Sequence, residues 1–522
     1  MSQRQAVAAL KEIAIVVNPA DNVVVVKTTV EPGLSVELPA GELVTVTGPV
    51  TPGHRFATRP IPAGEFVLQY GQPIGTSGGI AAGDPITPQN MSNDVPVVRD
   101  LPADLHTPPP NYLPEAEVPT WQGYRRADGR SGTRNFLLVI PTSMCASHEA
   151  QQIATLSEFT VWSREKFPNV DGVVAIAHNR GCGCSDGSNI EVMLRTLSNY
   201  ASHPNVGGVI FIGLGCEKTN LSAVEQYLQK EQRDLGKPVV RFGIQETGGT
   251  QAVIERGLKE VASMLPQLDE ARREQVSLRD LVLGVKCGGS DGFSGLSANP
   301  ALGHAADLLV RSGGTVVITE VPEFCGAEHL LAWRAKDRET GEAVYRMVDW
   351  YKKYAATFGT VLNENPSPGN VAGGLLNITI KSLGAIAKAG TTRVEGVVGY
   401  AETPPGRGLW LMQGPGYDQE STPGLVAAGA QVVVFTTGRG TTIGNAIAPV
   451  VKLASNTPVY QRMSRDLDLS AGGIVDGTES IADVGVRVFD HVRRVASGDT
   501  PACAEESKHR EFGIWAEQSV SL

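Results

Sequence analysis

Apolar segments that read as β-strands alternate with helical patterns from about Gly123 onward. The first region places "NFLLVIPTS" before "ASHEAQQIATLSEF", "GVVAIAH" before "GSNIEVMLRTLSNY" and "GGVIFIGLG" before "NLSAVEQYLQKEQ". A second region begins near Leu281, with the strand-like segments "LVLGVKCGG", "GTVVITEVPE", "TRVEGVVGYAE" and "AQVVVFTTGRG". Strands that alternate with helices pair in parallel through right-handed crossovers. The sequence therefore predicts an α/β protein with two parallel-sheet regions.

The residues before Gly123 have a different pattern. Short strand-like segments from about residue 13 to 95 are separated by turns such as "EPG" and "TPGH", which favours a small all-β barrel or clip. A proline-rich stretch without periodicity follows and is typical of a stiff connector. We divide the 522 residues into a small β domain (1–95), a linker (96–122), two α/β domains (123–275 and 276–500) and a polar tail (501–522) that the pattern does not place.

Composition excludes several classes of partner. The 45 basic and 55 acidic residues give a formal charge of −10, and no Lys/Arg-rich block is present, so we expect no nucleic acid partner. No leader pattern opens the sequence, and no apolar run reaches the roughly 18 residues of a membrane span. We expect a cytoplasmic protein that does not bind membranes. Seven cysteines, an odd number, argue against a disulfide framework and leave thiols available as ligands.

Four cysteines directly follow predicted strands: Cys145, Cys182, Cys216 and Cys287. Ligands of open α/β sheets bind beyond the carboxyl ends of the strands, so these four thiols could share one crevice. The alternative for each is ordinary core packing. In "AHNRGCGCSDG", His178 adds an imidazole beside Cys182 and Cys184, a ligand set that suits zinc or iron, although the spacing is not that of a zinc finger. His178 could equally cap a strand.

Other polar residues lie at strand-to-helix junctions. Glu320, Glu323 and Glu328 in "ITEVPEFCGAEHLL" either serve as base or metal ligand, or favour the positive end of a helix. Arg439 in "TTGRGTT" follows a strand and would form a carboxylate fork. The small polar residues of two loops could surround an anion or simply form turns. They are Ser290 and Asp291 in "CGGSDGFSG" and Asn365, Ser367 and Asn370 in "NENPSPGN".

Several long motifs resemble one family. "GYRRADGRSGTRNFLLVIPT", "GLGCE", "CGGSDGFSGLSANPALG", "TEVPEFCGAEHLL", "NPSPGN", "PGYD" and "FTTGRGT" occur in this order and are similar to those of the altronate/galactarate dehydratase family. The leading β module, with "PGHRFATRPIPAGEFVLQYGQPIG", resembles the SAF-type domain that precedes the catalytic part in that family. The resemblance extends over nearly the whole chain.

The resemblance implies a hydro-lyase that removes water from a sugar acid to give a 2-keto-3-deoxy acid. It implies a divalent metal, Fe²⁺ or else Mn²⁺, and we keep an iron–sulfur cluster as the alternative. The substrate would be a small hydroxycarboxylate, and the protein a homo-oligomer, which we expect to be a dimer. For proton transfer we predict His54, Glu320 and Glu323; for substrate binding Arg439, Asn365, Ser367, Asp291 and Ser290; and for metal binding Cys145, Cys182, Cys216, Cys287 and His178.

The sequence also departs from the family pattern. Histidines are replaced by Asn18 and Gln89, lysines by Gln69 and Val371, and an acidic residue by Thr379, whereas Cys184 is an additional thiol. These changes leave the hydroxy acid open. Two alternatives stay open as well: a lyase of the same mechanism that expels sulfite or ammonia, and a relative that binds sugar acids without catalysis.

Overall fold

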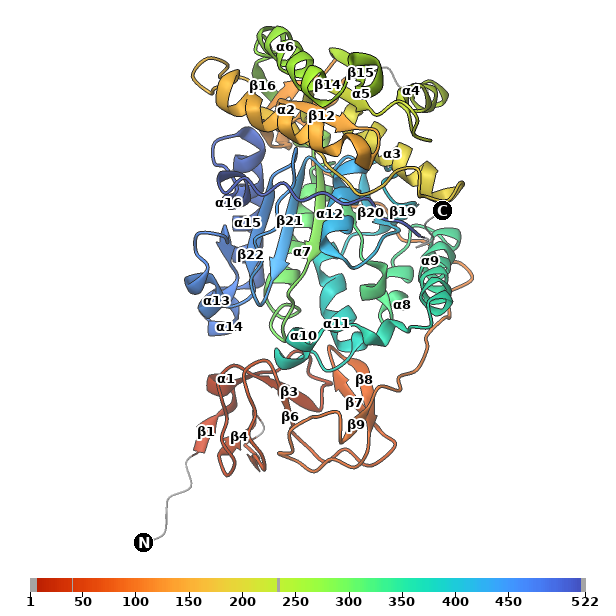
Figure 1. Ribbon diagram of the computed structural model, residues 1–522. Helices are drawn as coiled ribbons and strands as arrows, with labels where there is room; N and C mark the ends of the chain where they lie inside the picture. Colours follow the sequence, from red (N-terminus) through yellow and green to blue (C-terminus); the bar gives the residue numbers. More distant parts are fainter. Residues whose placement is uncertain (1–6, 40, 232–234, 518–522) are drawn as a thin grey trace.

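We describe residues 7–39, 41–231 and 235–517 of a computed structural model of the chain. The chain forms a small N-terminal domain and two α/β bodies stacked on one another (Figure 1). The predicted small domain and tail include residues 1–6 and 518–522, which lie outside the described residues. Among the helices of the described ranges, none combines the length and apolarity needed to cross a membrane.

The small domain consists of short strands that pair in three three-stranded sheets, with orders β1-β4-β5, β2-β3-β6 and β7-β8-β9. The strands are β1 (Val7–Ala9), β2 (Ala14–Ile15), β3 (Val23–Val26), β4 (Ser35–Glu37), β5 (Leu43–Thr45), β6 (Arg55–Ala57), β7 (Phe66–Gln69), β8 (Gln72–Ser77) and β9 (Met91–Ser92). The domain is not entirely β, because the helical turn α1 (Leu10–Ile13) buries Leu10 against the strands.

The connector runs in extended form along the side of the second α/β body (Figure 1). It is held there by main-chain hydrogen bonds, such as Leu113 N to Arg311 O at 2.8 Å, and by the indole of Trp333, which donates to Asp100 O at 2.8 Å. The connector then enters a small antiparallel sheet of order β11-β10-β16. Its strands are β10 (Thr120–Arg125), β11 (Ser131–Gly132) and β16 (Arg273–Ser277).

The first α/β body contains a parallel four-stranded sheet of order β13-β12-β14-β15. The strands are β12 (Phe136–Pro141), β13 (Gly172–Ala175), β14 (Val206–Gly213) and β15 (Val239–Gly243). The helices are α2 (Ser147–Thr160), α3 (Ser188–Ser202), α4 (Leu221–Lys230), α5 (Ile244–Thr247) and α6 (Thr250–Leu268). One face packs against α2 and α6, and the other packs against α3 and α4, whose core continues into the second body.

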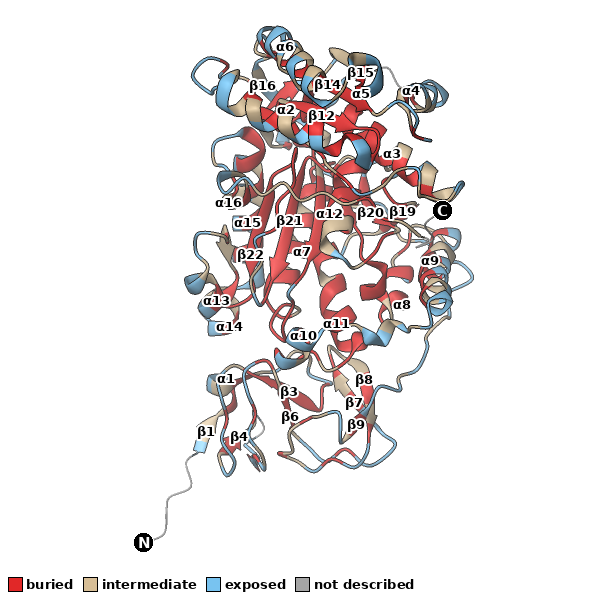
Figure 2. Ribbon diagram, in the orientation of Figure 1, coloured by how far each residue is buried: buried red, intermediate tan, exposed pale blue. Residues whose placement is uncertain are grey.

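The second α/β body contains a seven-stranded parallel sheet of order β19-β20-β18-β17-β21-β22-β23. The strands are β17 (Val282–Cys287), β18 (Thr315–Ile318), β19 (Val394–Val398), β20 (Gly408–Met412), β21 (Val432–Thr437), β22 (Val450–Ala454) and β23 (Leu469–Ser470). The strands are buried nearly throughout (Figure 2) because helices cover both faces, which explains their continuous Val/Ile/Leu runs.

Ten helices of this body surround the sheet in the described residues. They are α7 (Ala298–Arg311), α8 (Glu328–Ala332), α9 (Arg338–Thr357), α10 (Pro368–Ala372), α11 (Ile378–Ala385), α12 (Asp418–Ala427), α13 (Thr457–Arg462), α14 (Gly472–Asp476), α15 (Ile481–Ser497) and α16 (Cys503–Glu506). The chain order reverses at β17, since β18 pairs on one side of it and β21 on the other. Such a switch point is where open α/β sheets bind ligands, beyond the strand carboxyl ends.

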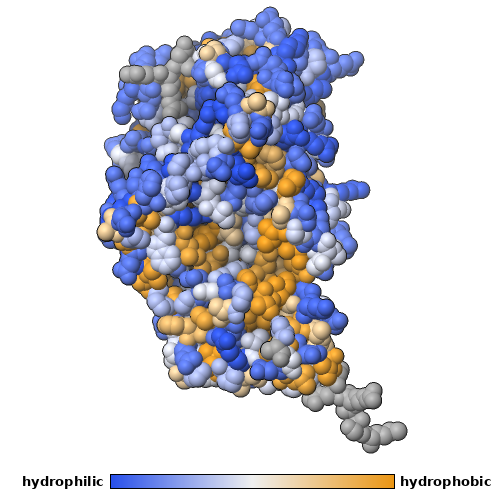
Figure 3. All heavy atoms as spheres, turned by 180° about the vertical axis from the view of Figure 1, so that it is seen from behind, coloured by the Kyte–Doolittle hydropathy of each residue, from blue (hydrophilic) through white to orange (hydrophobic). Residues whose placement is uncertain are grey.

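The predicted tail is not a free polar segment. Ile514 and Trp515 are buried, and Trp515 lies 5.9 Å from the ring of Trp350 on α9. The tail also contacts the first body, because Arg180 Nε donates to Ile514 O at 3.0 Å. It therefore connects the two α/β bodies. Seen from behind, hydrophobic side chains gather in the lower half of the molecule, toward the small domain, and the upper part is mostly hydrophilic (Figure 3).

Candidate active site

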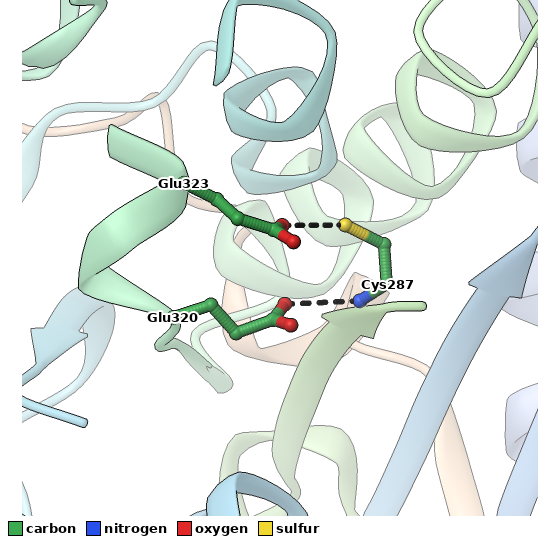
Figure 4. Close-up of side chains that lie close together, drawn as sticks. All are labelled: Cys287, Glu320 and Glu323. Carbon is green, nitrogen blue, oxygen red and sulfur yellow. Dashed lines mark hydrogen bonds between the residues drawn. The ribbon is translucent and has the colours of Figure 1, made fainter. Parts of the chain in front are cut away.

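Three side chains meet at the carboxyl end of β17, where the strand order reverses. Cys287 ends β17, and Glu320 and Glu323 belong to the segment after β18 (Figure 4). The main-chain N–H of Cys287 donates to Glu320 Oε2 at 3.1 Å, and the thiol of Cys287 donates to Glu323 Oε2 at 2.9 Å. Glu320 has a left-handed φ of 77°, a conformation that is costly for a non-glycine residue and is found mostly at functional sites.

Three lysines surround these side chains. Lys286 donates to Glu320 Oε1 and, at 2.6 Å, to Asp418 Oδ1 at the start of α12. Lys388 lies 3.0 Å from the thiol of Cys287, 3.1 Å from Glu320 Oε2 and 3.4 Å from Glu323 Oε2. A third ammonium group, that of Lys381, lies 3.0 Å from Glu323 Oε1. We call these seven residues the lysine–glutamate cluster: Lys286, Cys287, Glu320, Glu323, Lys381, Lys388 and Asp418.

The two glutamates of the cluster have different electrostatic environments. Burial raises the pKa of Glu320, and the charge of Glu323 adds to this effect while Lys286 and Lys388 oppose it. Burial also works against ionisation of Glu323, but Lys381, Lys388 and Lys286 together lower its pKa to about 2. Burial, followed by the charge of Glu323, raises the pKa of the Cys287 thiol, so this group is a neutral hydrogen-bond donor. Two carboxyl groups whose pKa values are driven apart are typical of acid–base catalysis.

Cys287, Glu320 and Glu323 form the one group of three candidate metal ligands within 4.8 Å of one another in the described ranges. Their spacing suits a cation, but each already contacts a lysine ammonium group. Three lysine charges balance the three carboxylates of Glu320, Glu323 and Asp418. A divalent ion would have to displace these ammonium groups, so the cluster as folded fits buried ion pairs better than a metal.

The cluster opens toward solvent at two points. The side chain of Asp418 is 31% exposed, although its partner Lys286 is fully buried. On the other side, Lys381 donates to Asn365 Oδ1 at 2.9 Å, and Asn365 lines a cavity of about 430 Å³ that Tyr417 also borders. The surface next to the cluster is therefore the one around Tyr417, which is 62% exposed.

The predicted substrate-binding residues lie on loops around the cluster, in different environments. Asp291 is buried and accepts hydrogen bonds from Ser455 Oγ at 2.9 Å and Asn456 Nδ2 at 3.0 Å, which orders its loop. The neighbouring Ser290 has a buried hydroxyl with no hydrogen-bond partner within the described structure. Arg439 is exposed at the end of β21, and Ser367 is used as the amino-terminal cap of α10.

The small domain reaches the edge of this region. His54 Nε2 lies 3.3 Å from Ala372 O at the end of α10, and burial lowers the pKa of its ring. The next residue, Arg55, is fully buried and donates to Gln69 and to Gly374 O. Gly53 lies so close to Gly373 that a side chain at Gly53 would clash with its carbonyl oxygen. The "PGH" loop is thus pressed against α10, and no contact links His54 to the lysine–glutamate cluster among the described contacts.

The five predicted metal ligands do not form one group in the described structure. Cys145, Cys182 and Cys216 are exposed on the first α/β body, whereas Cys287 is buried in the second. His178 is buried, its Nε2 lies 2.9 Å from Pro141 O, and its Nδ1 accepts from Arg180 N at 3.2 Å. Both ring nitrogens of His178 are therefore engaged by the backbone.

The sequence interpretation missed the lysines. Lys286 stands inside the apolar strand "LVLGVKC" and Lys388 inside the apolar stretch "LGAIAKAG". Lysine is rarely fully buried unless it is paired, so a lysine within an apolar element is a signal for a buried ion pair. Read in that way, the sequence could have indicated both residues.

Taken together, the fold and the cluster define an α/β enzyme with acid–base groups at the switch point of a parallel sheet and an added N-terminal domain. Three segments match family domains. Residues 12–94 match the altronate/galactarate dehydratase SAF domain, residues 123–269 the second domain of D-galactarate dehydratase/altronate hydrolase, and residues 278–520 the C-terminal domain of D-galactarate/altronate dehydratase.

Individual relatives agree with these matches. The chain is 34% identical to an altronate dehydratase of Bacillus subtilis (strain 168) over 507 residues, which cover 96% of this chain and 98% of the relative. It is 37% identical to the galactarate dehydratase (L-threo-forming) of Escherichia coli (strain K12), with 89% of each chain covered. It is also 33% identical to the (2R)-sulfolactate sulfo-lyase subunit beta of Chromohalobacter salexigens, covering 75% of this chain and 96% of that subunit.

The chain therefore belongs to the altronate/galactarate dehydratase family, as its motifs predicted, and it is a carbon–oxygen lyase of the hydro-lyase type. The fold prediction is confirmed for the parallel α/β architecture and the N-terminal SAF domain.

Proposed function

We propose that this chain removes water from a sugar acid, converting a 2,3-dihydroxycarboxylate into a 2-keto-3-deoxy acid at the lysine–glutamate cluster. One observation carries the proposal: two buried carboxyl groups with oppositely shifted pKa values lie within a cage of three ammonium groups at a sheet switch point. The family membership agrees with it, since relatives are named altronate and galactarate dehydratase.

The charges of the cluster suit this reaction. Loss of the C2 proton places negative charge on the substrate carboxylate, and ammonium groups that are already in place stabilise that charge without reorganisation. Glu320, whose pKa is raised by burial, is our candidate for the group that takes the C2 proton. Ionised Glu323 keeps Lys381 and Lys388 oriented through its two oxygens.

The C2–H bond breaks and its proton goes to Glu320, the C2–C3 double bond forms, and the C3–O bond breaks. The leaving hydroxyl takes a proton from Lys388 and departs as water. The resulting enol loses its C2 hydroxyl proton to water, takes a proton at C3 from water and becomes the 2-keto acid, and proton exchange with water then resets Glu320 and Lys388.

Residues around the cluster would bind the rest of the substrate. Ser290 offers an unpartnered hydroxyl, and Asn365 faces the cavity of about 430 Å³. Arg439, exposed at the end of β21, remains our candidate for a carboxylate contact. His54, Asp291 and Ser367 are bound to neighbouring groups and would support these loops rather than touch substrate.

Product analysis on a panel of aldonic and aldaric acids tests the proposal. We expect at least one member to yield a 2-keto acid with no sulfite or ammonia released, and Glu320→Gln to lose this activity. The absence of a keto acid from every member, with folded protein carrying its metal, would contradict the proposal and favour a non-catalytic sugar-acid-binding relative.

One relative supports a second candidate function. The (2R)-sulfolactate sulfo-lyase subunit beta matches 75% of this chain, and loss of sulfite from C3 passes through the same C2 carbanion. Sulfite release from a sulfonated hydroxy acid, faster than water release from any sugar acid, would favour this second function.

A further inference from the structure

Three cysteines occupy one edge of the four-stranded sheet. Cys145 follows β12, Cys182 follows β13 and Cys216 follows β14, and these three strands are parallel neighbours in the order β13-β12-β14. The carboxyl ends of parallel neighbours lie at the same edge of the sheet, so the three loops emerge together.

Hydrogen bonds join the loops to one another. Met144 N, next to Cys145, donates to Arg180 O at 2.7 Å in the Cys182 loop. Thr142 Oγ1 donates to Glu217 Oε1 at 2.6 Å, and Thr219 Oγ1 donates to Thr142 O at 2.7 Å, which ties the Cys216 loop to the strand that leads into Cys145. The loop that carries Cys182 and the loop that carries Cys216 are therefore both joined to the segment that contains Cys145.

The exposure of these thiols is unusual. Of the seven cysteines, Cys145, Cys182 and Cys216 are the exposed ones, whereas cysteine is among the most buried residue types of proteins. Glycines next to the thiols keep the surface open: Gly181 and Gly183 flank Cys182, and Gly215, with a φ of 127°, precedes Cys216. Three exposed thiols on one open edge are not part of a packed core, and they are available to bind a group.

Spacing distinguishes the kinds of bound group. A single tetrahedral ion with metal–sulfur bonds of about 2.3 Å brings its thiolates to about 3.8 Å from one another. The three sulfurs do not meet within 4.8 Å, because the one such group in the described residues is Cys287, Glu320 and Glu323. A cubane of iron and sulfide holds its cysteines at separate corners, farther apart than one ion does.

The cysteine edge adjoins the entrance to the lysine–glutamate cluster. Residues 177–179 of the Cys182 loop line a cavity of about 370 Å³ together with Tyr417, Glu420 and the tail residues 512–514. Arg180 Nη2 lies 3.7 Å from Glu420 on α12, the helix that begins at Asp418. In Figure 1 the loop before α3 lies beside the C-terminal end of the described chain, in keeping with these contacts.

We propose that Cys145, Cys182 and Cys216 bind an iron–sulfur cluster of four irons, so that one iron has no cysteine ligand and is open to a hydroxyl oxygen of the substrate. The binding of the cluster rests on the cysteine edge alone, while its role toward the leaving hydroxyl rests on the proposed dehydratase function. At the Cys287 site, lysine ammonium groups already contact the candidate ligands, so we place the iron at the cysteine edge of the four-stranded sheet instead.

Iron and acid-labile sulfide measured in the anaerobically purified full chain, before and after reconstitution with ferrous iron and sulfide, test the proposal. We expect about four of each per chain and a broad visible absorption. Each of Cys145→Ser, Cys182→Ser and Cys216→Ser should lose most of the iron, the sulfide and the absorption. Cys503→Ser, in α16, is the matched control and should keep all three signals.

Other outcomes overturn the proposal. Iron without sulfide would show a mononuclear site, and equal iron and sulfide in the wild type and the three variants would place the cluster elsewhere. Loss of the cluster in Cys184→Ser would show a fourth thiolate ligand and remove the open iron. Dehydration by protein without sulfide contradicts this inference but not the proposed function, whereas a full cluster with no keto acid from any substrate contradicts the function alone.

Discussion

The two parallel sheets carry unusual residues at the same topological position, the carboxyl edge. The two edges differ in how far these residues are buried and in whether they are paired. At the seven-stranded sheet, Lys286, Glu320 and Lys388 are fully buried and paired with one another. At the four-stranded sheet, Cys145 and Cys216 are exposed on open loops. Topology indicates where a site lies, and charge compensation indicates what it can do: at one edge the charges of the side chains are balanced by ion pairs, and the other edge presents exposed thiols.

The largest effect is expected from Glu320→Gln, because this change removes the proposed proton acceptor while keeping its shape. We expect kcat to fall by roughly 10²–10⁴-fold, the usual contribution of general acid–base catalysis. Iron and sulfide content should stay at the wild-type level if the two edges are separate. Glu328→Gln is the control, a buried glutamate of the next helix paired with Lys352, and should leave kcat near wild type. Equal losses in both variants would contradict the assignment.

Removing one lysine from each of the two sheet edges compares how much their ion pairs contribute to the free energy of unfolding. Lys388→Met leaves Glu320 and Glu323 buried with one cation fewer, and breaking a buried ion pair in this way costs about 3–5 kcal/mol. Lys218→Met at the cysteine edge breaks an exposed pair with Asp186, worth about 0.2–1 kcal/mol. Thermal unfolding should show a much larger loss for Lys388→Met. Similar losses would mean that the lysine–glutamate cluster is hydrated and open.

Acid should weaken the buried cluster through Glu323. Burial opposes its ionisation, yet the three lysines lower its pKa to about 2 from the ordinary value of 4.5. A carboxyl group with a lowered pKa in the folded state adds stability above the unfolded pKa and loses it as the pH falls toward the folded pKa. We therefore expect a loss of the order of 3 kcal/mol between about pH 4.5 and pH 2.

Glu323→Gln checks this pH dependence. Its free energy of unfolding should be lower than that of the wild type near neutral pH and should change less between about pH 4.5 and pH 2. The exposed Glu364→Gln is the control and should follow the wild-type curve. A wild-type curve that stays flat through this window would show that Glu323 is not held ionised by its lysines.

The sequence predicted the strands that carry the two edges better than it predicted the contacts between them. Cys287, Glu320 and Glu323 were chosen because they follow apolar strands, and the structure brings these three together. The ends of strands can be predicted from an apolar run that stops at glycine and small polar residues. Partners such as Lys381 and Asp418 come from distant segments, Asp418 from 132 residues after Lys286, and no local pattern gives such a pairing.

Local sequence patterns also failed to predict some elements that are short or fully buried by their neighbours. Strands β15 and β20 were not predicted, although β20 is fully buried in the second sheet. The tail looked polar by composition, yet Trp515 packs between aromatic residues of α9 and Tyr400. The contacts of one buried tryptophan position the tail, and the average composition of the segment does not reveal a single residue of this kind.

The smallest effect on stability is expected when a cysteine is replaced by serine at each edge in turn. The same pair of variants separates the two edges most clearly. In Cys287→Ser the hydroxyl can still donate to Glu323 and accept from Lys388, so the loss of stability should be about 1 kcal/mol and the iron content unchanged. In Cys145→Ser the exposed side chain leaves the fold of the apoprotein intact, while iron and sulfide are lost. Thermal unfolding should therefore show the larger loss of stability for Cys287→Ser, whereas metal analysis should show the larger loss of iron and sulfide for Cys145→Ser. If Cys287→Ser instead lost the iron and Cys145→Ser kept it, the metal would lie in the buried cluster, its lysines would have to move aside on binding, and the proposed difference between the two edges would be wrong.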